Sequence, residues 1–273
     1  MVSGPRETTS ARAEPAARAQ TGPGISAVLP AYNEDALIER SVRRMAGVLR
    51  GLTHDFEIVV VNDGSQDRTG EILAQLQHMA PGLHLRIVTH PVNQGYGAAL
   101  ASGFDAATRD LIFMTDGDEQ FDVAELADFL PAMTPATDLV IGWREHRADP
   151  PVRLFNAWGW KQLVNGLFGY TAHDVDCAFK LFRRRVWQRV TVHARGATFS
   201  AEFLIKARRL GFQVVERPVS HYPRTAGSAT GARLHVIVRA FVELFQLWRS
   251  LDRELAADRR VDRSQQRPNP RAA

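Results

Sequence analysis

"FEIVVVNDGSQDRTGEILAQLQHM", residues 56–79, contains a strand, a turn and a helix in one continuous run. The apolar run "IVVV" is typical of a strand that is covered on both faces, as the strands of parallel sheets are. The dipeptide "DG" at Asp63 and Gly64 favours a turn, and the apolar residues from Asp67 to Met79 recur at helical spacing. The stretch therefore predicts one repeating unit of an α/β domain.

The same alternation continues on both sides of this unit. Short apolar runs occur there, separated by amphipathic stretches: "ISAVLP", "LRIVTH", "DLIFMTD" and "DLVIG". We expect further helices at about residues 35–50 and 94–108. Strands that alternate with helices indicate an α/β fold with a mainly parallel sheet flanked by helices. Such sheets bind ligands outside the carboxyl ends of their strands, so a site is expected at "PAYNE", "NDGS", "NQGYG" and "DGDEQ".

Size and composition describe a globular protein with a sizeable core. The chain has 273 residues, of which 45% are hydrophobic, and this fits one large domain or a domain with an appendage. A formal charge of +4 suits anionic ligands or an anionic membrane face. No basic segment is interleaved with stacking aromatic residues, so nucleic acid is not the expected partner. The single cysteine, Cys177, excludes an internal disulfide framework.

The two ends of the chain differ from its middle. Residues 1–24 lack the apolar region of a signal peptide and are expected to be a disordered tail. One folded domain is expected over residues 25–231, with a helix near 152–170, then an amphipathic helix at 232–250 and a polar tail at 251–273. No segment has the roughly 18 to 20 uncharged apolar residues of a membrane-spanning helix. We expect a cytoplasmic protein that is able to lie at the cytoplasmic face of a membrane.

The segment "DGDEQFD", residues 116–122, places several acids directly after an apolar strand. Asp116 and Asp118, with Gln120, offer hard oxygen ligands that suit Mg²⁺ or Mn²⁺. A solvated turn is the alternative. We expect Asp122 to cap the following helix and Glu125 to complete a capping box with it.

Taken together, six motifs resemble the family 2 glycosyltransferases of GT-A fold, among them the dolichyl-phosphate mannose and polyprenyl-phosphate hexose synthases. The motifs are "LPAYNE", "VVVNDGSQDRT", "NQGYGAAL", "DGDEQ", "IGWR" and "DCAFKLFRR", and the resemblance covers residues 25–249. It implies a Rossmann-like GT-A domain with C-terminal amphipathic helices. The implied reaction is the inverting, metal-dependent transfer of a hexose from a nucleotide sugar to a polyprenyl phosphate. GDP-mannose is the favoured donor and a UDP-hexose the other.

The resemblance also implies roles for particular residues on the donor side. The positions that hold the base and ribose of the nucleotide sugar correspond to Pro30, Tyr32, Glu34 and Asp63. Asp116 would touch the ribose and the metal, and Asp118 and Gln120 correspond to the metal ligands. The family often has a hydrophobic residue before this glutamine, whereas Glu119 stands here and adds a charge beside the metal ligands.

On the acceptor side, the resemblance points to groups that bind a lipid phosphate or the donor pyrophosphate. Arginine suits phosphate because its planar fork donates two hydrogen bonds in parallel. An ordinary surface role is the alternative for each of these arginines taken singly. The matching positions are Arg144, Arg153, Asn156, His221, Arg224 and Ser228.

The class of acceptor is indicated by the residues at the start of a later helix, around Glu202. Many relatives that act on a hydroxyl carry a pair of acids at the start of this helix, whereas "FSAEFLIKA" offers Glu202 without a neighbouring acid. A phosphate monoester, with a second pKa of roughly 6, is already ionised and needs no general base. This favours a phosphate acceptor. Asp176 and Lys180 match positions near the active site, and a structural role for Lys180 is an equal alternative.

Several alternatives stay open. The aromatic segment 152–170 and the helix at 233–250 resemble interfacial helices that lie on a membrane, but an intramolecular or dimer interface would also cover them. A peripheral enzyme of this kind would depend on a separate membrane partner.

Another interpretation is a soluble transferase that acts on a hydroxyl of a small molecule or glycan, with Glu202 or a neighbouring residue as general base. A third is an inactive nucleotide-sugar-binding protein, although the metal ligands are present. A nucleotidyltransferase would need a Gly-rich basic loop, which "VLPAYNED" lacks.

Overall fold

The structure is a computed structural model, and it describes residues 22–145, 151–223, 240–251 and 253. One sheet carries the strands in the order β3-β2-β1-β4-β6-β5-β7. Its strands are β1 (Ile25–Ala31), β2 (Phe56–Asp63), β3 (Leu85–His90), β4 (Leu111–Met114), β5 (Leu139–Arg144), β6 (Lys180–Arg183) and β7 (Val214–Val219). The helices are α1 (Ile38–Leu52), α2 (Thr69–Met79), α3 (Tyr96–Ala106), α4 (Leu126–Phe129), α5 (Pro151–Phe168), α6 (Arg184–Arg189) and α7 (Phe199–Arg209).

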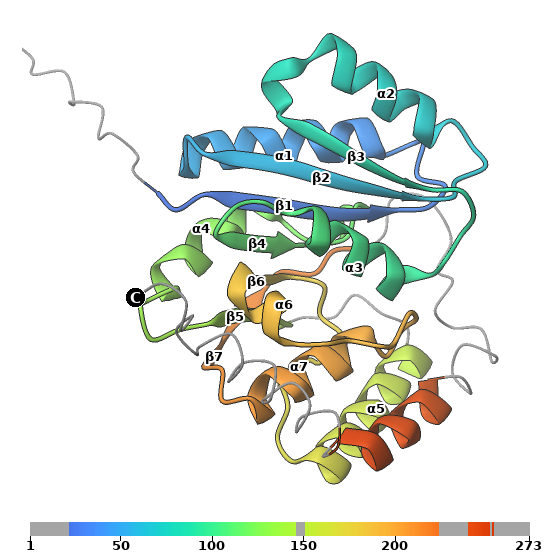
Figure 1. The fold of residues 1–273 in the computed structure, drawn as a ribbon, viewed down its shortest axis with the longest axis vertical. Helices are drawn as coiled ribbons and strands as arrows, with labels where there is room; N and C mark the ends of the chain where they lie inside the picture. Colours follow the sequence, from blue (N-terminus) through green and yellow to red (C-terminus); the bar gives the residue numbers. More distant parts are fainter. Residues whose placement is uncertain (1–21, 146–150, 224–239, 252, 254–273) are drawn as a thin grey trace, which may run out of the picture.

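The sheet is mainly parallel, as the sequence predicts. β1 pairs in parallel with β2 and β4, β2 with β3, and β5 with β7. β6 alone runs antiparallel to its neighbours, β4 and β5. The strands β1, β2, β3 and β4 therefore all end on the same side of the sheet (Figure 1). We call this side, where the carboxyl ends of the strands lie, the carboxyl edge of the sheet.

Helices cover both faces of the central strands. Every residue of β2 is buried, which requires cover above and below the sheet. Because crossovers between parallel strands are right-handed, α1 and α2 pack on one face and α3 on the other. α3 contacts β1, β2 and α7, and Gly103 allows its close approach to Val28 and Val61. The core predicted from the apolar runs is thus built as a layer of strands between helices.

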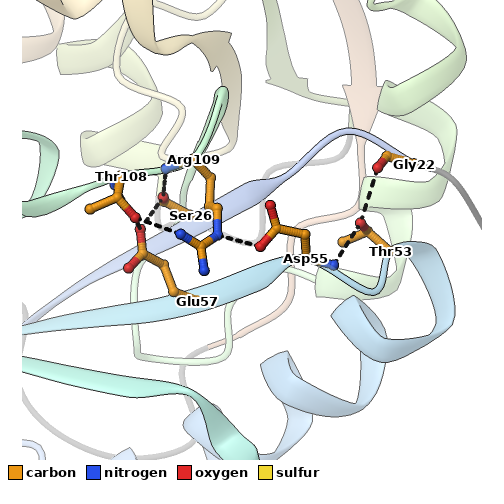
Figure 2. A network of polar contacts seen from close by, with 7 residues as sticks. All are labelled: Gly22, Ser26, Thr53, Asp55, Glu57, Thr108 and Arg109. Atoms are coloured by element: carbon orange, nitrogen blue, oxygen red, sulfur yellow. Dashed lines mark hydrogen bonds and ion pairs between the residues drawn. The ribbon is translucent and has the colours of Figure 1, made fainter.

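A polar network secures the opposite edge of the sheet, at the start of β1 and β2 (Figure 2). The carboxylate of Glu57 accepts hydrogen bonds from the hydroxyl of Ser26 (2.6 Å) and from the amide and hydroxyl of Thr108 (2.7 and 2.8 Å). Arg109 donates its amide to Ser26 and forms an ion pair with Asp55. Burial alone would raise the pKa of Glu57, but these hydrogen bonds outweigh it and lower the pKa. The network fixes the ends of the strands that lie away from the candidate site.

Two local predictions differ from the structure. The helices begin two or three residues later than expected, at 38, 69 and 96, because the preceding residues take part in loop hydrogen bonds. Asp67, for example, accepts from the amides of Asp35 and Thr69. The capping box is wrong: Asp122 does cap the 3₁₀ turn Val123–Glu125, but the Glu125 carboxylate accepts from the amide of Ser220.

The aromatic segments form two neighbouring helices. Residues 240–251 are helical and lie beside α5, with the rings of Trp160 and Phe241 in edge-to-face contact (Figure 1). Leu244, Leu247 and Leu251 join the hydrophobic core. Large apolar side chains of the two helices remain about half exposed, namely Trp158, Phe241, Val242, Phe245 and Trp248. Among the described helices, none is both long and apolar enough to cross a bilayer.

Candidate functional site

The loops after β1 and β2 lock together at the carboxyl edge of the sheet. The amide of Asn33 donates to the hydroxyl of Ser65 (3.0 Å), and the Asn33 side chain accepts from the amide of Gln66 (2.8 Å). The amide of Glu34 donates to the hydroxyl of Thr69 (2.9 Å). Of the predicted donor residues of the first loop, Glu34 is held by this last contact and is half-buried, Pro30 is half-buried and Tyr32 is 39% exposed.

Asp63 lies at the centre of the next set of contacts. Its carboxylate accepts from the amides of Gln94 and Gly95, both at 2.9 Å, and lies 2.6 Å from Nδ1 of His90. The other ring nitrogen of His90 is 2.9 Å from the hydroxyl of Ser102. Because a carboxylate only accepts, Nδ1 of His90 carries the proton that it donates. His90 was not among the residues predicted from the sequence, although it ends "LRIVTH" as Asp63 ends "FEIVVVND", and the two residues pair in register.

The acids after β4 have distinct surroundings. The hydroxyl of Tyr96 donates to Asp116 (2.9 Å); Tyr96 is 36% exposed, and partial burial together with this carboxylate raises the pKa of Tyr96 above its usual value. Asp118 is 4% exposed and accepts from the amide of Gln120 (3.1 Å). The side-chain N–H of Gln120 donates a hydrogen bond to the carbonyl of Tyr222 (3.1 Å). That bond fixes which end of the Gln120 amide remains an acceptor.

This donor set fits a divalent cation that is held jointly with a diphosphate. Asp116, Asp118 and Gln120 supply carboxylate and amide oxygens, the hard ligands of Mg²⁺ and Mn²⁺. The described part of the chain contains no cluster of three or more His, Cys, Asp or Glu side chains that could hold a metal ion by themselves. Mg²⁺ does not require such a group, since it is commonly held by one or two carboxylates with substrate phosphates and water.

Glu119 has a partner that the sequence did not suggest. Both carboxylate oxygens bind the guanidinium of Arg40 on α1, one of them at 2.7 Å from Nε. The backbone of Glu119 is left-handed, with φ 58°, which costs on the order of 1 kcal/mol for a residue with a side chain. The extra charge beside the predicted metal ligands is therefore paired with α1.

The predicted acceptor residues have different surroundings. The fork of Arg144 is engaged by the Asp174 carboxylate at 2.6 and 2.8 Å. Burial works against the charge, but Asp174 outweighs it and raises the pKa of Arg144. His221 is buried and packs edge-on against Phe121 beside the predicted metal ligands, whereas Asn156 is exposed on α5. The Arg153 side chain, Arg224 and Ser228 lie outside the described residues.

Two further predicted residues have structural contacts. Lys180 is fully buried and donates to the carbonyls of Val175 and Cys177, and burial lowers the pKa of Lys180. Glu202 accepts from the amides of His193 (3.0 Å) and Ala194 (2.8 Å) and forms an ion pair with Lys206 (2.7 Å). Its role as a general base stays a prediction.

Comparisons with known proteins show the family of the chain. A sequence model described as glycosyl transferase family 2 matches residues 26–191. Dodecaprenyl-phosphate galacturonate synthase of Rhizobium johnstonii is 30% identical over 208 residues, which are 74% of this chain and 60% of that protein. Dolichyl-phosphate beta-glucosyltransferase ALG5A of Trichomonas vaginalis is 32% identical over 212 residues, 71% of this chain and 64% of that protein. The chain spans less than two thirds of the length of these relatives.

Solved structures share the fold. Glucosyl-3-phosphoglycerate synthase from Mycobacterium tuberculosis, in complex with UDP, superposes with a TM-score of 0.61 at 20% identity over 84% of this chain and 82% of that one. The same enzyme with Mn²⁺ and UDP-glucose gives 0.61 at 20% identity over 83% and 80%. At 20% identity the similarity concerns the fold alone, and it confirms the predicted GT-A architecture.

Proposed function

The chain belongs to glycosyl transferase family 2, and on that premise we propose that it transfers a hexose from a nucleotide sugar to a polyprenyl phosphate, with inversion. The observation that carries the proposal is the group of oxygen donors after β4. Asp116, Asp118 and Gln120 stand at the carboxyl edge of the sheet, where α/β sheets bind their ligands. The interlocked loops after β1 and β2 border the same edge.

On the donor side, the chain's residues bind and orient the nucleotide sugar. The nucleoside is proposed to lie against Pro30, Tyr32, Glu34 and Asp63. Asp118 and Gln120 would hold Mg²⁺ or Mn²⁺, which when bound acts as a Lewis acid that stabilises charge on the leaving diphosphate. Tyr96 keeps Asp116 in a fixed orientation by donating its hydroxyl to that carboxylate.

On the acceptor side, a phosphate oxygen is the proposed nucleophile. It is ionised near neutral pH, since the second pKa of a phosphate monoester is roughly 6, so no side chain has to remove a proton. The engagement of Glu202 with two backbone amides and Lys206 supports this choice over a hydroxyl acceptor. The lipid phosphate is proposed to meet Arg144, Arg153, Asn156, His221, Arg224 and Ser228.

The sugar is proposed as a hexose, with GDP-mannose as the first donor to test. The names of curated relatives contain galacturonate, glucose and 4-deoxy-4-formamido-L-arabinose. Because the solved glucosyl-3-phosphoglycerate synthase of similar fold holds UDP-glucose, a panel of donors also includes uridine-linked sugars beside GDP-mannose.

We further propose that the enzyme lies peripherally on the cytoplasmic face of a membrane, with a separate membrane protein as its partner. The half-exposed aromatic side chains of α5 and of residues 240–251 support this, because amphipathic helices with aromatic residues bind at lipid interfaces. Arg249 stands over the ring of Phe245 and adds a positive charge to the same helix.

The test is a transfer assay with labelled GDP-mannose, UDP-glucose and UDP-galacturonate, each with Mg²⁺ or Mn²⁺. The acceptors are a polyprenyl phosphate and the matching polyprenol, in vesicles. We expect a lipid-linked product from the phosphate and none after addition of a chelator. A product formed only from the unphosphorylated polyprenol would refute the phosphate nucleophile.

A further inference from the structure

Helix α1 contacts the candidate metal loop, residues 116–122, at three points. The three residues lie on one side of the helix, because Arg44 is four residues after Arg40 and three after Ser41. The guanidinium of Arg40 pairs with Glu119, the hydroxyl of Ser41 donates to the carbonyl of Gly117 (2.8 Å), and the guanidinium of Arg44 pairs with Asp122 (2.8 Å).

The contact at Glu119 acts at the centre of the loop. Asp118 accepts from the amide of Gln120, so a closed turn is formed around Glu119. Glu119 has the left-handed backbone of this turn, with φ 58°. Whatever fixes Glu119 therefore fixes the relative orientation of the side chains before and after it, which are the two predicted metal ligands.

We infer that Arg40 is a positioning residue, which orients Asp118 and Gln120 toward the metal through its bidentate ion pair with Glu119. The inference rests on the proposed function, since it assigns a role at the same site. Arg40 does not touch the metal or the substrate in this assignment. Its side chain is 61% exposed while that of Glu119 is 11% exposed, so the arginine reaches down from the surface of α1 to a nearly enclosed carboxylate.

A positioning role and a purely structural role predict different results. The arginine side of the pair is 61% exposed, and screening by solvent limits what the pair contributes to global stability. Groups that orient metal ligands, by contrast, commonly change metal affinity by about 10- to 100-fold when they are removed. Loss of the pair should thus weaken metal binding without a matching fall in the unfolding temperature.

The experiment is a titration of the full chain with Mn²⁺ in the presence of UDP or GDP, with free Mn²⁺ followed by electron paramagnetic resonance. Arg40→Met and Glu119→Gln should each raise the Mn²⁺ dissociation constant about tenfold. The charge-reversed pair Arg40→Glu with Glu119→Arg should recover most of the affinity. Arg43→Met is the matched control, because it removes an exposed ion pair with Glu39 (2.8 Å) on the same helix and should leave binding unchanged.

The outcomes separate this inference from the proposed function. If the unmodified chain binds Mn²⁺ and nucleotide but Arg40→Met binds as tightly as Arg43→Met, the positioning role is refuted and the proposed function stands. The positioning role would also be refuted if metal-free Arg40→Met unfolded at a temperature so much lower that the loss of folded protein explained the loss of Mn²⁺ affinity. An unmodified chain that binds neither Mn²⁺ nor nucleotide would overturn both.

Discussion

The carboxylate of Asp63 lies 2.6 Å from the imidazole of His90, and the two residues end adjacent parallel strands. The same carboxylate accepts the amides of Gln94 and Gly95, where α3 is about to begin. One side chain therefore joins the ends of β2 and β3 to the start of α3. The position proposed to face the nucleoside is held rigidly by its neighbours.

Replacement of His90 by Ala should loosen this junction. We expect a loss of about 1–3 kcal/mol in the free energy of unfolding, because the buried Asp63 carboxylate loses a partner. The KM for the nucleotide sugar should rise more than kcat falls. Denaturant unfolding and steady-state kinetics check this. Ser102→Ala, which removes only the hydroxyl at the far side of the imidazole, should cost less, about 0.5–1.5 kcal/mol.

Asp118→Ala should abolish most transfer while the chain stays folded. Removing a group that serves the stabilisation of developing charge commonly lowers kcat by about 10²- to 10³-fold. The control is Asp128→Ala, which removes an exposed acid from α4 close by in the sequence. Initial rates with circular dichroism spectra measure both. Substantial activity in Asp118→Ala would refute the metal assignment.

Glu202→Gln separates a structural from a catalytic role. The Glu202 and Lys206 side chains are 6% and 0% exposed, and breaking a buried pair costs about 3 kcal/mol or more because one charge is left unpaired. We expect this loss of stability, with transfer per folded molecule retained. Glu39→Gln, at an exposed pair, should change stability by less than about 1 kcal/mol. Full stability with lost turnover would instead identify Glu202 as a general base.

Gly64→Ala and Gly47→Ala should have opposite effects on stability. Gly64 has φ 68°, and an added Cβ would lie 2.4 Å from the carbonyl carbon of Val92. We expect a loss of about 2 kcal/mol or more from strain and overlap. Gly47 lies within α1 with nothing near its Cβ direction, so alanine should raise stability by about 0.5–1 kcal/mol. Thermal unfolding of both variants tests the loop geometry.

Cys177 should resist thiol reagents until the chain unfolds. It is the only cysteine and is fully buried, and burial raises the pKa of its thiol to about 12. At pH 8 such a thiol is only about one part in ten thousand thiolate, the reactive form. The unfolded thiol, with its pKa near 9.0, ionises first. The contribution of Cys177 to stability is therefore full below pH 9 and is lost as the pH rises toward 12. Rapid labelling of the native protein would contradict the buried placement.

The sequence alone determined the elements, because the spacing of apolar residues records which faces are buried. "FEIVVVND" and "ISAVLP" became adjacent parallel strands, and the polar segments that follow them came to lie at one edge of the sheet. The cap at Asp122 was also visible, since capping depends on neighbours only two residues away.

Only the tertiary structure decided which distant groups meet. Glu119 pairs with Arg40, 79 residues away, and Glu125 binds the amide of Ser220, 95 residues away, in place of the local capping box. Strand β6 lies between β4 and β5 and is antiparallel to both. The spacing of apolar residues along the chain does not predict this arrangement. A side chain's partner is set by how separate elements pack in space, whereas periodicity reports only that the side chain faces inward or outward. The sequence therefore pointed to residues 116–122 as the candidate metal loop, and the packing of α1 against this loop brought Arg40 to the charge of Glu119.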